Sequence, residues 1–470
     1  MSTSKIVGIL ILAAMAAAST ARASETAESP YQAPAGGKTT LTLEEKGKVL
    51  TLEDTVRNAL ENHPSIKSAA ERVGAQQAVL RQQFADYYPT LSLANSYQTS
   101  QGRSDSTAFD TYTSQAKFKM TIYNFGKREG TVQSARETLD ATRYNLKTSA
   151  DAVVLSVKQA YYLYLQAIAL VRVAEETVRD RELIVRQARA FYEVGTRPKI
   201  DVVRAEANLY TAQSGLITAQ NNVKVAWVTL KNAMGLPDLP EQAVPAMTGA
   251  VVESLAESFS AARFPLSLEQ SRTQGFAARP ELLSFEAQRR AQDQTIATNR
   301  RSHLPDILVE GFYGRKNVSN LHGKEKVGAD TVTTAQTTFP LKQEWQVQLS
   351  LNIPIFDGFR TTYKTEESVR TYYSIKFQEE QQRQQVALEV EQGYANLVSS
   401  QERIKASKAA EGAAKENLEL ANGRYQVGVG SIIEVTDAQE TYIRAEVDYI
   451  NSLYNYKIEE AKLLKAVGTP

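Results

Sequence analysis

The sequence predicts a mainly α-helical fold with a smaller β component, built from long coiled-coil hairpins and four amphipathic β-strands. Three observations lead to this prediction. The chain contains two copies of one unit. Each copy has a long helical segment without proline, and each copy has segments in which apolar and polar residues alternate.

The internal duplication is clearest at the start and near the middle of each copy. LTLEDTVRNALENHP (Leu50–Pro64) matches LSLEQSRTQGFAARP (Leu266–Pro280), and YEVGTRPKIDVVRAE (Tyr192–Glu206) matches YQVGVGSIIEVTDAQ (Tyr425–Gln439). The chain is therefore expected to contain a signal peptide (1–23), an N-terminal linker (24–49), a first repeat (50–237), an inter-repeat linker (238–265) and a second repeat (266–470).

The N-terminus is typical of an export signal. Lys5 supplies the positive charge, Ile6–Ala18 the apolar region and Ala21-Arg22-Ala23 a cleavage site of small residues. This apolar region is too short to span a bilayer. No later segment approaches about 18 continuous apolar residues, so we expect no transmembrane helix.

The composition excludes several classes of function. The formal net charge is +1, which provides no basic surface for nucleic acid, and there is no cysteine for a disulfide, a thiolate metal site or a lipid anchor. The histidines His63, His303 and His322 lack metal-ligand spacing. No nucleophile elbow and no glycine-rich phosphate loop is present. We therefore expect no enzymatic activity, no cofactor and no metal site.

Each copy is expected to begin with a capped helix. Capping-box patterns start at Thr51 and Ser267, and the helical sequence that follows is interrupted at Pro64 and Pro280. A further proline ends this helical stretch and precedes the strands.

Strand sequence follows in each copy. In Tyr112–Tyr123 and Trp345–Ile355 apolar residues alternate with polar ones, as in strands with one apolar face. Thr90–Gln98 and Asp306–Gly314 are weaker strand candidates. The predicted connections are polar loops, Ser100–Thr111 and Arg315–Lys342.

Very long helices come next. Lys127–Val194 and Arg360–Val427 contain no proline, and each would span about 100 Å at a rise of about 1.5 Å per residue. Shorter helices, Ile200–Met234 and Ile433–Val467, follow them. The helix after Pro64 or Pro280 and the shorter helix together match the length of the long one, so we expect the two to stack end to end beside it. Thin apolar seams favour coiled-coil-like packing.

The strands indicate assembly of several chains. About ten residues with alternate apolar positions fit a strand of an outer-membrane barrel. Four strands cannot close a barrel, and an open edge is not tolerated in lipid. Three chains that donate four strands each would give a barrel of twelve.

With these features the sequence resembles the outer-membrane efflux proteins, the TolC-like trimeric exit ducts. The resemblance rests on the duplication, the order of elements, IPIFDGFR (Ile353–Arg360) and the paired hairpin sequences. It implies a homotrimer with a twelve-stranded β-barrel in outer-membrane lipid, a periplasmic α-helical barrel and an equatorial region. It also implies a passive duct of a tripartite efflux or type I secretion system, with a periplasmic adaptor (membrane fusion protein) and an inner-membrane transporter as partners.

The repeated stretches are predicted to be the turns of two helical hairpins. Gly195 and Gly428 suit left-handed C-caps, Pro198 suits a first helical position, and Ser431 with Glu434 fits a capping box. By resemblance these tips dock the adaptor. The tip residues are Val194, Gly195 and Thr196 in the first hairpin and Val427, Gly428, Val429, Gly430 and Ser431 in the second.

The resemblance also places the periplasmic gate at this end. Glu434 and Asp437 match two positions at which a TolC-like duct carries constricting carboxylates, whereas its gate-locking arginine falls on Gly430. Arg197, near Asp201, occupies the equivalent place in the first hairpin. Asp201 is a further candidate for the gate; its alternative role is stabilisation of the helix start, where the helix dipole alone favours an acid by about 0.3–1 kcal/mol.

A periplasmic coiled-coil adaptor or structural protein of an envelope-spanning complex is the alternative function. An adaptor should carry a compact β domain between its helices and has no use for strands with an exposed apolar face. The two strand pairs flanked by very long helices favour the duct.

Overall fold

The computed structural model describes residues 51–101, 108–238, 265–327, 330–334 and 342–469. The predicted signal peptide, the N-terminal linker and nearly all of the inter-repeat linker lie outside these residues. The chain divides into two compact units, one of which contains the sheet and the other the helical hairpin turns. Each unit is described by itself.

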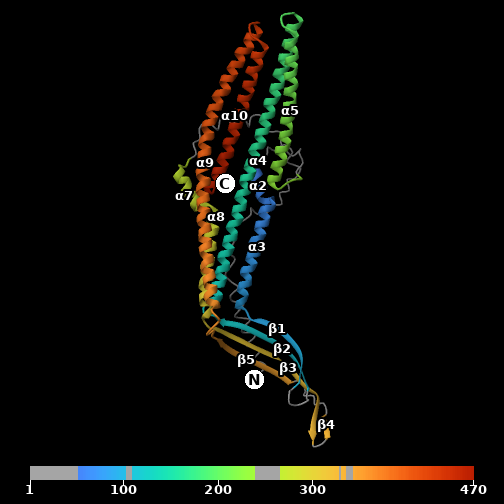
Figure 1. Cartoon of the computed structure of the whole chain (residues 1–470), viewed down its shortest axis with the longest axis vertical. Coiled ribbons are helices and arrows are strands. Elements are labelled where there is room, and N and C mark those ends of the chain that lie inside the picture. Colours follow the sequence, from blue (N-terminus) through green and yellow to red (C-terminus); the bar gives the residue numbers. More distant parts are fainter. Residues whose placement is uncertain (1–50, 102–107, 239–264, 328–329, 335–341, 470) are drawn as a thin grey trace. The chain divides into compact units, whose positions relative to one another are not determined.

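The helices follow the predicted order in both copies (Figure 1). In the first copy they are α2 (Leu52–Asn62), α3 (Pro64–Phe84), α4 (Lys127–Glu193) and α5 (Lys199–Met234). In the second copy they are α7 (Leu268–Ala278), α8 (Pro280–Arg300), α9 (Arg360–Gln426) and α10 (Ile432–Val467). Short 3₁₀ turns, η2 (Ala85–Tyr87) and η4 (Arg301–His303), extend α3 and α8 toward the strands.

The helix ends carry the expected caps. The Thr51 side chain accepts a hydrogen bond from the Asp54 amide, and Ser267 forms a full capping box with Gln270. Gly235 and Gly468 end α5 and α10 in the left-handed conformation, with φ of 72° and 86°.

The ends of α5 and α10 meet the joints between the two short helices of the same copy. A Cβ atom on Gly235 would lie 2.7 Å from the His63 Cα, and one on Gly468 would lie 2.8 Å from the Ala278 Cβ. These close approaches match the predicted end-to-end arrangement of α5 with α3 and of α10 with α8. Glycine is needed here for two reasons, the positive φ and the lack of space.

The helical unit buries thin seams, as the sequence predicts. One cluster joins Leu282, Val386, Val390 and Ala466, and another contains Leu397, Tyr456 and Leu463. In α4, one 18-residue window has a mean hydropathy of 1.2, and half of this window is buried inside the fold. Core helices of soluble proteins reach the same length and hydropathy, so this window is weak evidence of a membrane span.

The sheet is an antiparallel meander in the order β1-β2-β3-β5, with a short fifth strand, β4, paired to the far end of β3 (Figure 1). The strands are β1 (Thr90–Gln101), β2 (Ala108–Tyr123), β3 (Asp306–Val327), β4 (Asp330–Thr334) and β5 (Lys342–Asn352). Among the described residues, β1 and β5 are therefore the edges of the four-stranded part.

The predicted loop boundaries were wrong, because strand pairing continues beyond them. The β1–β2 pairs extend to Gln101 and Ala108, and β3 continues through the predicted loop to Val327. The residues of β3 up to His322 pair with β2. With 16 residues, β2 is longer than the stretch in which apolar and polar residues alternate, so it offers β3 additional backbone partners. At the other end, β5 stops at Asn352 rather than Ile355, near Pro354, which has no N–H to donate to a ladder.

The sheet has one apolar face that is exposed in the single chain. Leu91, Phe118, Gly311 and Val347 pair across all four strands and so share this face. Leu91 is 75% exposed, and Leu349, two residues beyond Val347 on β5, is 72% exposed. Two exposed cross-strand aromatic pairs, Tyr97 with Tyr112 and Tyr313 with Trp345, extend the face. A face of this kind requires an apolar environment.

Candidate functional site at the helical hairpin turns

The turns of the α4–α5 and α9–α10 hairpins have the same backbone geometry. In the first, the amides of Thr196 and Arg197 both donate to the Phe191 carbonyl, at 3.0 and 3.3 Å. In the second, the amides of Val429 and Gly430 both donate to the Arg424 carbonyl, at 3.1 and 2.8 Å. The same turn is therefore built from two different sequences.

Both turns use the predicted glycines as left-handed C-caps. Gly195 has φ of 78° and Gly428 has φ of 84°, a conformation that L side chains rarely adopt. No other heavy atom lies within 4 Å of a Cβ built on either residue, so the constraint is conformational. Gly430 has a different reason to be glycine, because its Cβ would lie 2.9 Å from the Tyr425 nitrogen.

Two details of the helix starts differ from the sequence prediction. Pro198 is the N-cap of α5 rather than its first helical residue, since its ψ is 155° and its carbonyl accepts from the Asp201 amide. Ser431 caps α10 by accepting from the Glu434 amide at 3.2 Å. The Glu434 carboxylate does not complete the capping box but lies 3.5 Å from Nε of Arg424.

Arg197 joins the two hairpins. Its Nη2 donates to the carbonyls of Gly430 at 2.6 Å and Gly428 at 3.1 Å, and its guanidinium lies 5.4 Å from the centre of the Tyr425 ring. These carbonyls belong to the second turn, in which Gly430 aligns with the gate-locking arginine of a TolC-like duct. Within the described residues no ion pair joins Arg197 to Asp201, and both instead flank Tyr425. Charge-assisted hydrogen bonds of this kind are stronger than neutral ones.

A shared core supports the turns. Ile184, Val185 and Ala188 of α4 pack with residues of α5, α9 and α10. Phe191 meets Tyr425 edge to face, with ring centres 5.6 Å apart. Tyr425 is 1% exposed, whereas Tyr192, which aligns with it in the repeat, is 46% exposed. Burial raises the pKa of Tyr425; the negative charge of Asp201 adds to this rise and the positive charge of Arg197 opposes it.

The predicted acids occupy different environments. Ile432, Val435 and Ala438 face the core, so Glu434 and Asp437 lie on the opposite, exposed side of α10. Asp201 is half-buried and lies in the first turn of α5. Val194, Val427 and Val429 are exposed at the tips, with Val427 at 75%.

Sequence reasoning missed Phe191, Arg424 and the ion pair of Arg189 with Glu206 at 2.6 Å, because only tertiary contacts give them a role.

A second charged cluster lies within the same helical unit, between α4, α9 and α10. Glu176 and Asp180 of α4 line a cavity of about 220 Å³ with Tyr442 and Glu446 of α10. Burial, together with the negative charges of Glu176 and Glu411, raises the pKa of Glu446 to about 6, and the positive charge of Arg172 opposes this rise. Across the described residues, no group of three or more histidine, aspartate and glutamate side chains is arranged to hold a metal ion.

An antiparallel sheet with an exposed apolar face, continuous in the chain with very long helices, defines a subunit of an outer-membrane channel. The chain belongs to the outer membrane efflux protein family, whose model matches residues 55–236 and 274–469. The family consists of passive outer-membrane channels rather than enzymes.

Curated relatives agree with this assignment over most of the chain. The chain is 26% identical to the outer membrane protein TolC of Escherichia coli over 425 residues, which cover 87% of this chain and 80% of the relative. It is 22% identical to the outer membrane efflux protein BepC of Brucella suis over 420 residues, which cover 89% and 85% of the two chains. The protein is therefore an outer-membrane exit duct of an efflux system that extends into the periplasm.

Solved structures show the same fold. A crystal structure of CusC matches with a TM-score of 0.73 at 19% identity and covers 94% of this chain and 97% of that one. The outer membrane protein VceC of Vibrio cholerae matches with a TM-score of 0.71 at 19% identity and covers 89% and 96%. Channels of the TolC family are trimeric and work with efflux-pump partners.

Replacing Glu446 with Gln should stabilise the protein at neutral pH. The folded pKa of about 6 lies above the ordinary value of 4.5, so the charged form is disfavoured in the fold. This penalty is absent below about pH 4.5, grows as the pH rises toward 6 and is complete above 6. The variant should gain about 1 kcal/mol at pH 7.5, after allowance for solvent screening, and nothing at pH 4.5.

The measurement is the apparent melting temperature in detergent, followed by helical circular dichroism at both pH values. Glu440→Gln, an exposed change of the same type on α10, is the control and should leave the pH dependence as it is. An equal gain for Glu446→Gln at both pH values would contradict this account of the cluster.

Proposed function

We propose that three copies of this chain form a passive duct, with a twelve-stranded barrel in the outer membrane and a helical tube in the periplasm. The main support for this proposal is the sheet. It has an exposed apolar face, and among the described residues its two edge strands, β1 and β5, are each unpaired on one side. Unpaired backbone groups are not tolerated in lipid. Pairing β5 of one copy with β1 of the next closes a barrel with three copies of four strands, without any further element.

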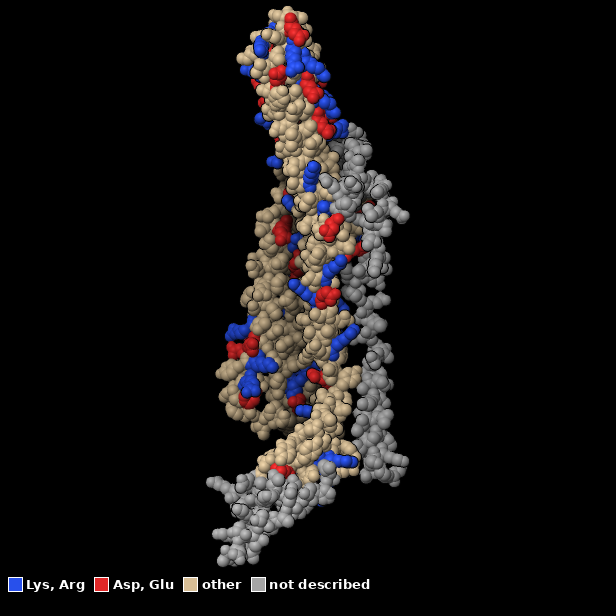
Figure 2. All heavy atoms as spheres, turned by 90° about the vertical axis from the view of Figure 1, so that its right-hand side faces the viewer, with Lys and Arg blue, Asp and Glu red and all other residues tan. Residues whose placement is uncertain are grey.

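A groove on the helical unit supports the same assembly. It has a volume of about 730 Å³ and is lined by α4, α5 and α10. Small residues such as Ala167, Ala212, Gly215 and Ala219 line it, which allows close approach of a neighbouring helix. No charged residue occurs in 159–171 of α4 or 207–223 of α5. Figure 2 shows charged side chains gathered toward the turn end of this hairpin, followed by a mainly uncharged stretch.

The hairpin tips are proposed to dock a periplasmic adaptor, which connects the duct to an inner-membrane transporter of a tripartite efflux or type I secretion system. Val194, Val427 and Val429 are exposed there and have no apolar neighbour to shield them in the single chain. Exposed apolar side chains on a rigid turn favour a protein partner.

Glu434 and Asp437 are proposed to form the constriction at the periplasmic mouth, and Arg197 to hold it closed. Both acids are exposed and lie three residues apart, so threefold symmetry would produce two rings of three carboxylates. Arg197 binds the carbonyls of the second turn and so couples the movement of one hairpin to that of the other. Asp201 is assigned mainly to stabilisation of the helix start.

Disulfide cross-linking should detect the trimer directly. The native chain has no cysteine. In one chain β1 and β5 are separated by two strands, about 14 Å at roughly 4.8 Å per strand, which is too far for a disulfide. Ser92→Cys combined with a cysteine scan of polar-face positions on β5 should therefore give cross-linked trimers on non-reducing gels. Monomers at every scanned position, in intact outer membranes, would contradict the barrel.

Gly428→Glu should abolish export and adaptor binding without loss of the trimer. The change puts a bulky charged residue at φ of 84° on the exposed tip. Gly412→Glu adds the same charge to an exposed helical position of α9 with no heavy atom near its Cβ, and should leave export intact. The measurements are export in cells and co-purification of the adaptor after cross-linking. Normal export by the Gly428→Glu variant at normal protein levels would contradict adaptor docking at the tips.

Glu434→Ala with Asp437→Ala should reduce cation selectivity and relieve block by trivalent cations from the periplasmic side in planar bilayers. Six carboxylates in a narrow ring bind multivalent cations strongly, and this ring would be lost. Asp201→Ala should change either property less. Arg197→Ala should raise the single-channel conductance, because the turns are no longer tied together. Unchanged block and conductance in all three variants would place the gate elsewhere.

A further inference from the structure

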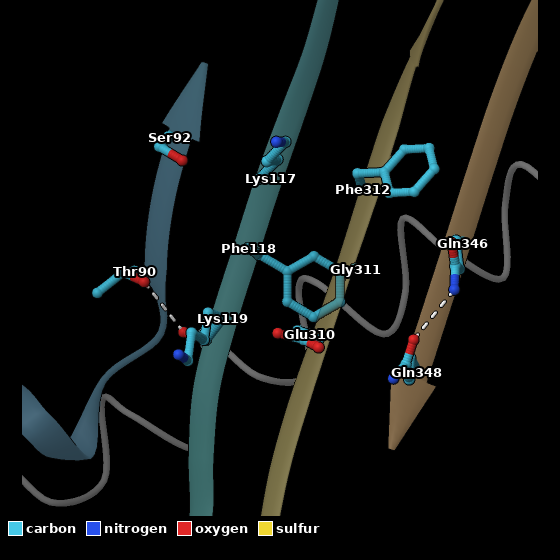
Figure 3. Close-up of a pocket in the computed structure, with 10 residues that line it drawn as sticks. All are labelled: Thr90, Ser92, Lys117, Phe118, Lys119, Glu310, Gly311, Phe312, Gln346 and Gln348. Atoms are coloured by element: carbon cyan, nitrogen blue, oxygen red, sulfur yellow. Dashed lines mark hydrogen bonds between the residues drawn. The ribbon is translucent and has the colours of Figure 1, made fainter. Parts of the chain in front are cut away.

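The polar face of the sheet carries a hollow whose residues come from all four long strands. Thr90, Lys119, Glu310 and Gln348 pair in one row across the sheet, and Ser92, Lys117, Phe312 and Gln346 pair in the next. Figure 3 shows these side chains around the hollow, which has a volume of about 420 Å³. That volume is within the range of pockets that hold small organic molecules.

The floor of the hollow is set by Gly311. A Cβ atom there would lie 2.7 Å from Cε1 of Phe118, so the Phe118 ring occupies the place of the missing side chain. Figure 3 shows this ring lying between β2 and β3 across Gly311. Phe118 and Gly311 belong to the apolar face, and Phe312 is the aromatic side chain that the polar face itself presents at the hollow.

The charge on this face is positive. Lys117 and Lys119 are exposed, and within the described residues neither forms an ion pair. Across the described polar face, four lysines (Lys117, Lys119, Lys316 and Lys342) and two glutamates (Glu310 and Glu344) give 4 − 2 = +2, with Asp306 left out because it pairs with Lys127 at 2.7 Å. Two like charges at neighbouring positions raise the local potential and attract anions.

Uncharged hydrogen-bonding groups complete the site. Nε2 of Gln346 donates to Oε1 of Gln348 at 3.1 Å, and Nε2 of Gln348 donates to the Ser350 hydroxyl at 2.9 Å. This chain of hydrogen bonds orients the amides along β5 and leaves further donor capacity for a solute. The hollow thus combines two ammonium groups and one carboxylate, that of Glu310 opposite Lys119, with aromatic and amide groups.

We propose that this hollow is a low-affinity site for amphipathic organic anions, such as aromatic sulfonates or carboxylates, on their way through the barrel. The proposal rests on the proposed function, since only a closed barrel turns the polar face of the sheet toward a lumen. Three copies would place six ammonium groups around that lumen. The anionic group of the solute binds Lys117 and Lys119, and its aromatic body contacts Phe312.

Channel block by 2-naphthalenesulfonate tests the proposal. The purified trimer is placed in planar bilayers and the probe is added on the barrel side. We expect concentration-dependent block of the wild type and little block by the cation 2-naphthylmethylammonium. Lys117→Gln with Lys119→Gln should raise the half-blocking concentration at least tenfold. Lys117→Arg with Lys119→Arg keeps the charge and should preserve the block.

Lys316→Gln with Lys342→Gln is the matched control, because it removes two charges from the same face outside the hollow and should change the block less than twofold. Phe312→Ser should weaken the block by the naphthalene probe but leave the single-channel conductance unchanged. If the wild type and the variant with Lys117→Gln and Lys119→Gln were blocked equally, in channels of normal conductance, the proposed anion site would be wrong but the duct would stand. Failure of the wild type to form any channel would overturn the duct as well.

Discussion

The constraint on which the rest of the structure depends is that backbone N–H and C=O groups in lipid must be hydrogen-bonded. The four long strands satisfy one another internally, but β1 and β5 each leave one row of backbone groups open. Among the residues that the structure describes, no further strand covers these two edges. Self-association is thus a requirement of the sheet, and the helical unit has to supply an uncharged face along which copies can pack.

Local sequence signals predicted most of the fold. The ends of α4, α5, α9 and α10 fell within one residue of prediction, because proline, glycine and capping residues act on the backbone next to them. α4 runs Lys127–Glu193 against a predicted end at Val194, and α10 begins at Ile432 against a predicted start at Ile433. Strand positions followed from the alternation of apolar residues. These effects act between residues that are close along the chain, so a single sequence is enough to predict them.

Long-range contacts account for what the sequence did not predict. The extension of β3 depends on its partners, because β2 pairs with it up to His322 and β4 pairs with it from Gly323 to Val327. Neither the apolar alternation nor the turn residues predict these pairings. The partners of Arg197 lie in the other hairpin, 231 and 233 residues away along the chain. Likewise, the hollow at Lys117 is lined by residues of all four long strands, so strand register rather than a motif creates it.

The unequal burial of Tyr192 and Tyr425 has a consequence for symmetry. The two hairpins of a chain share one turn geometry, yet one aligned tyrosine is buried and the other is exposed, and Arg197 reaches only from the first hairpin to the second. A ring of six such hairpins therefore repeats every two, not every one. In the proposed trimer, a partner that encircles the six hairpins with six identical copies would therefore meet two kinds of binding site in alternation, and its copies would not all be bound equally.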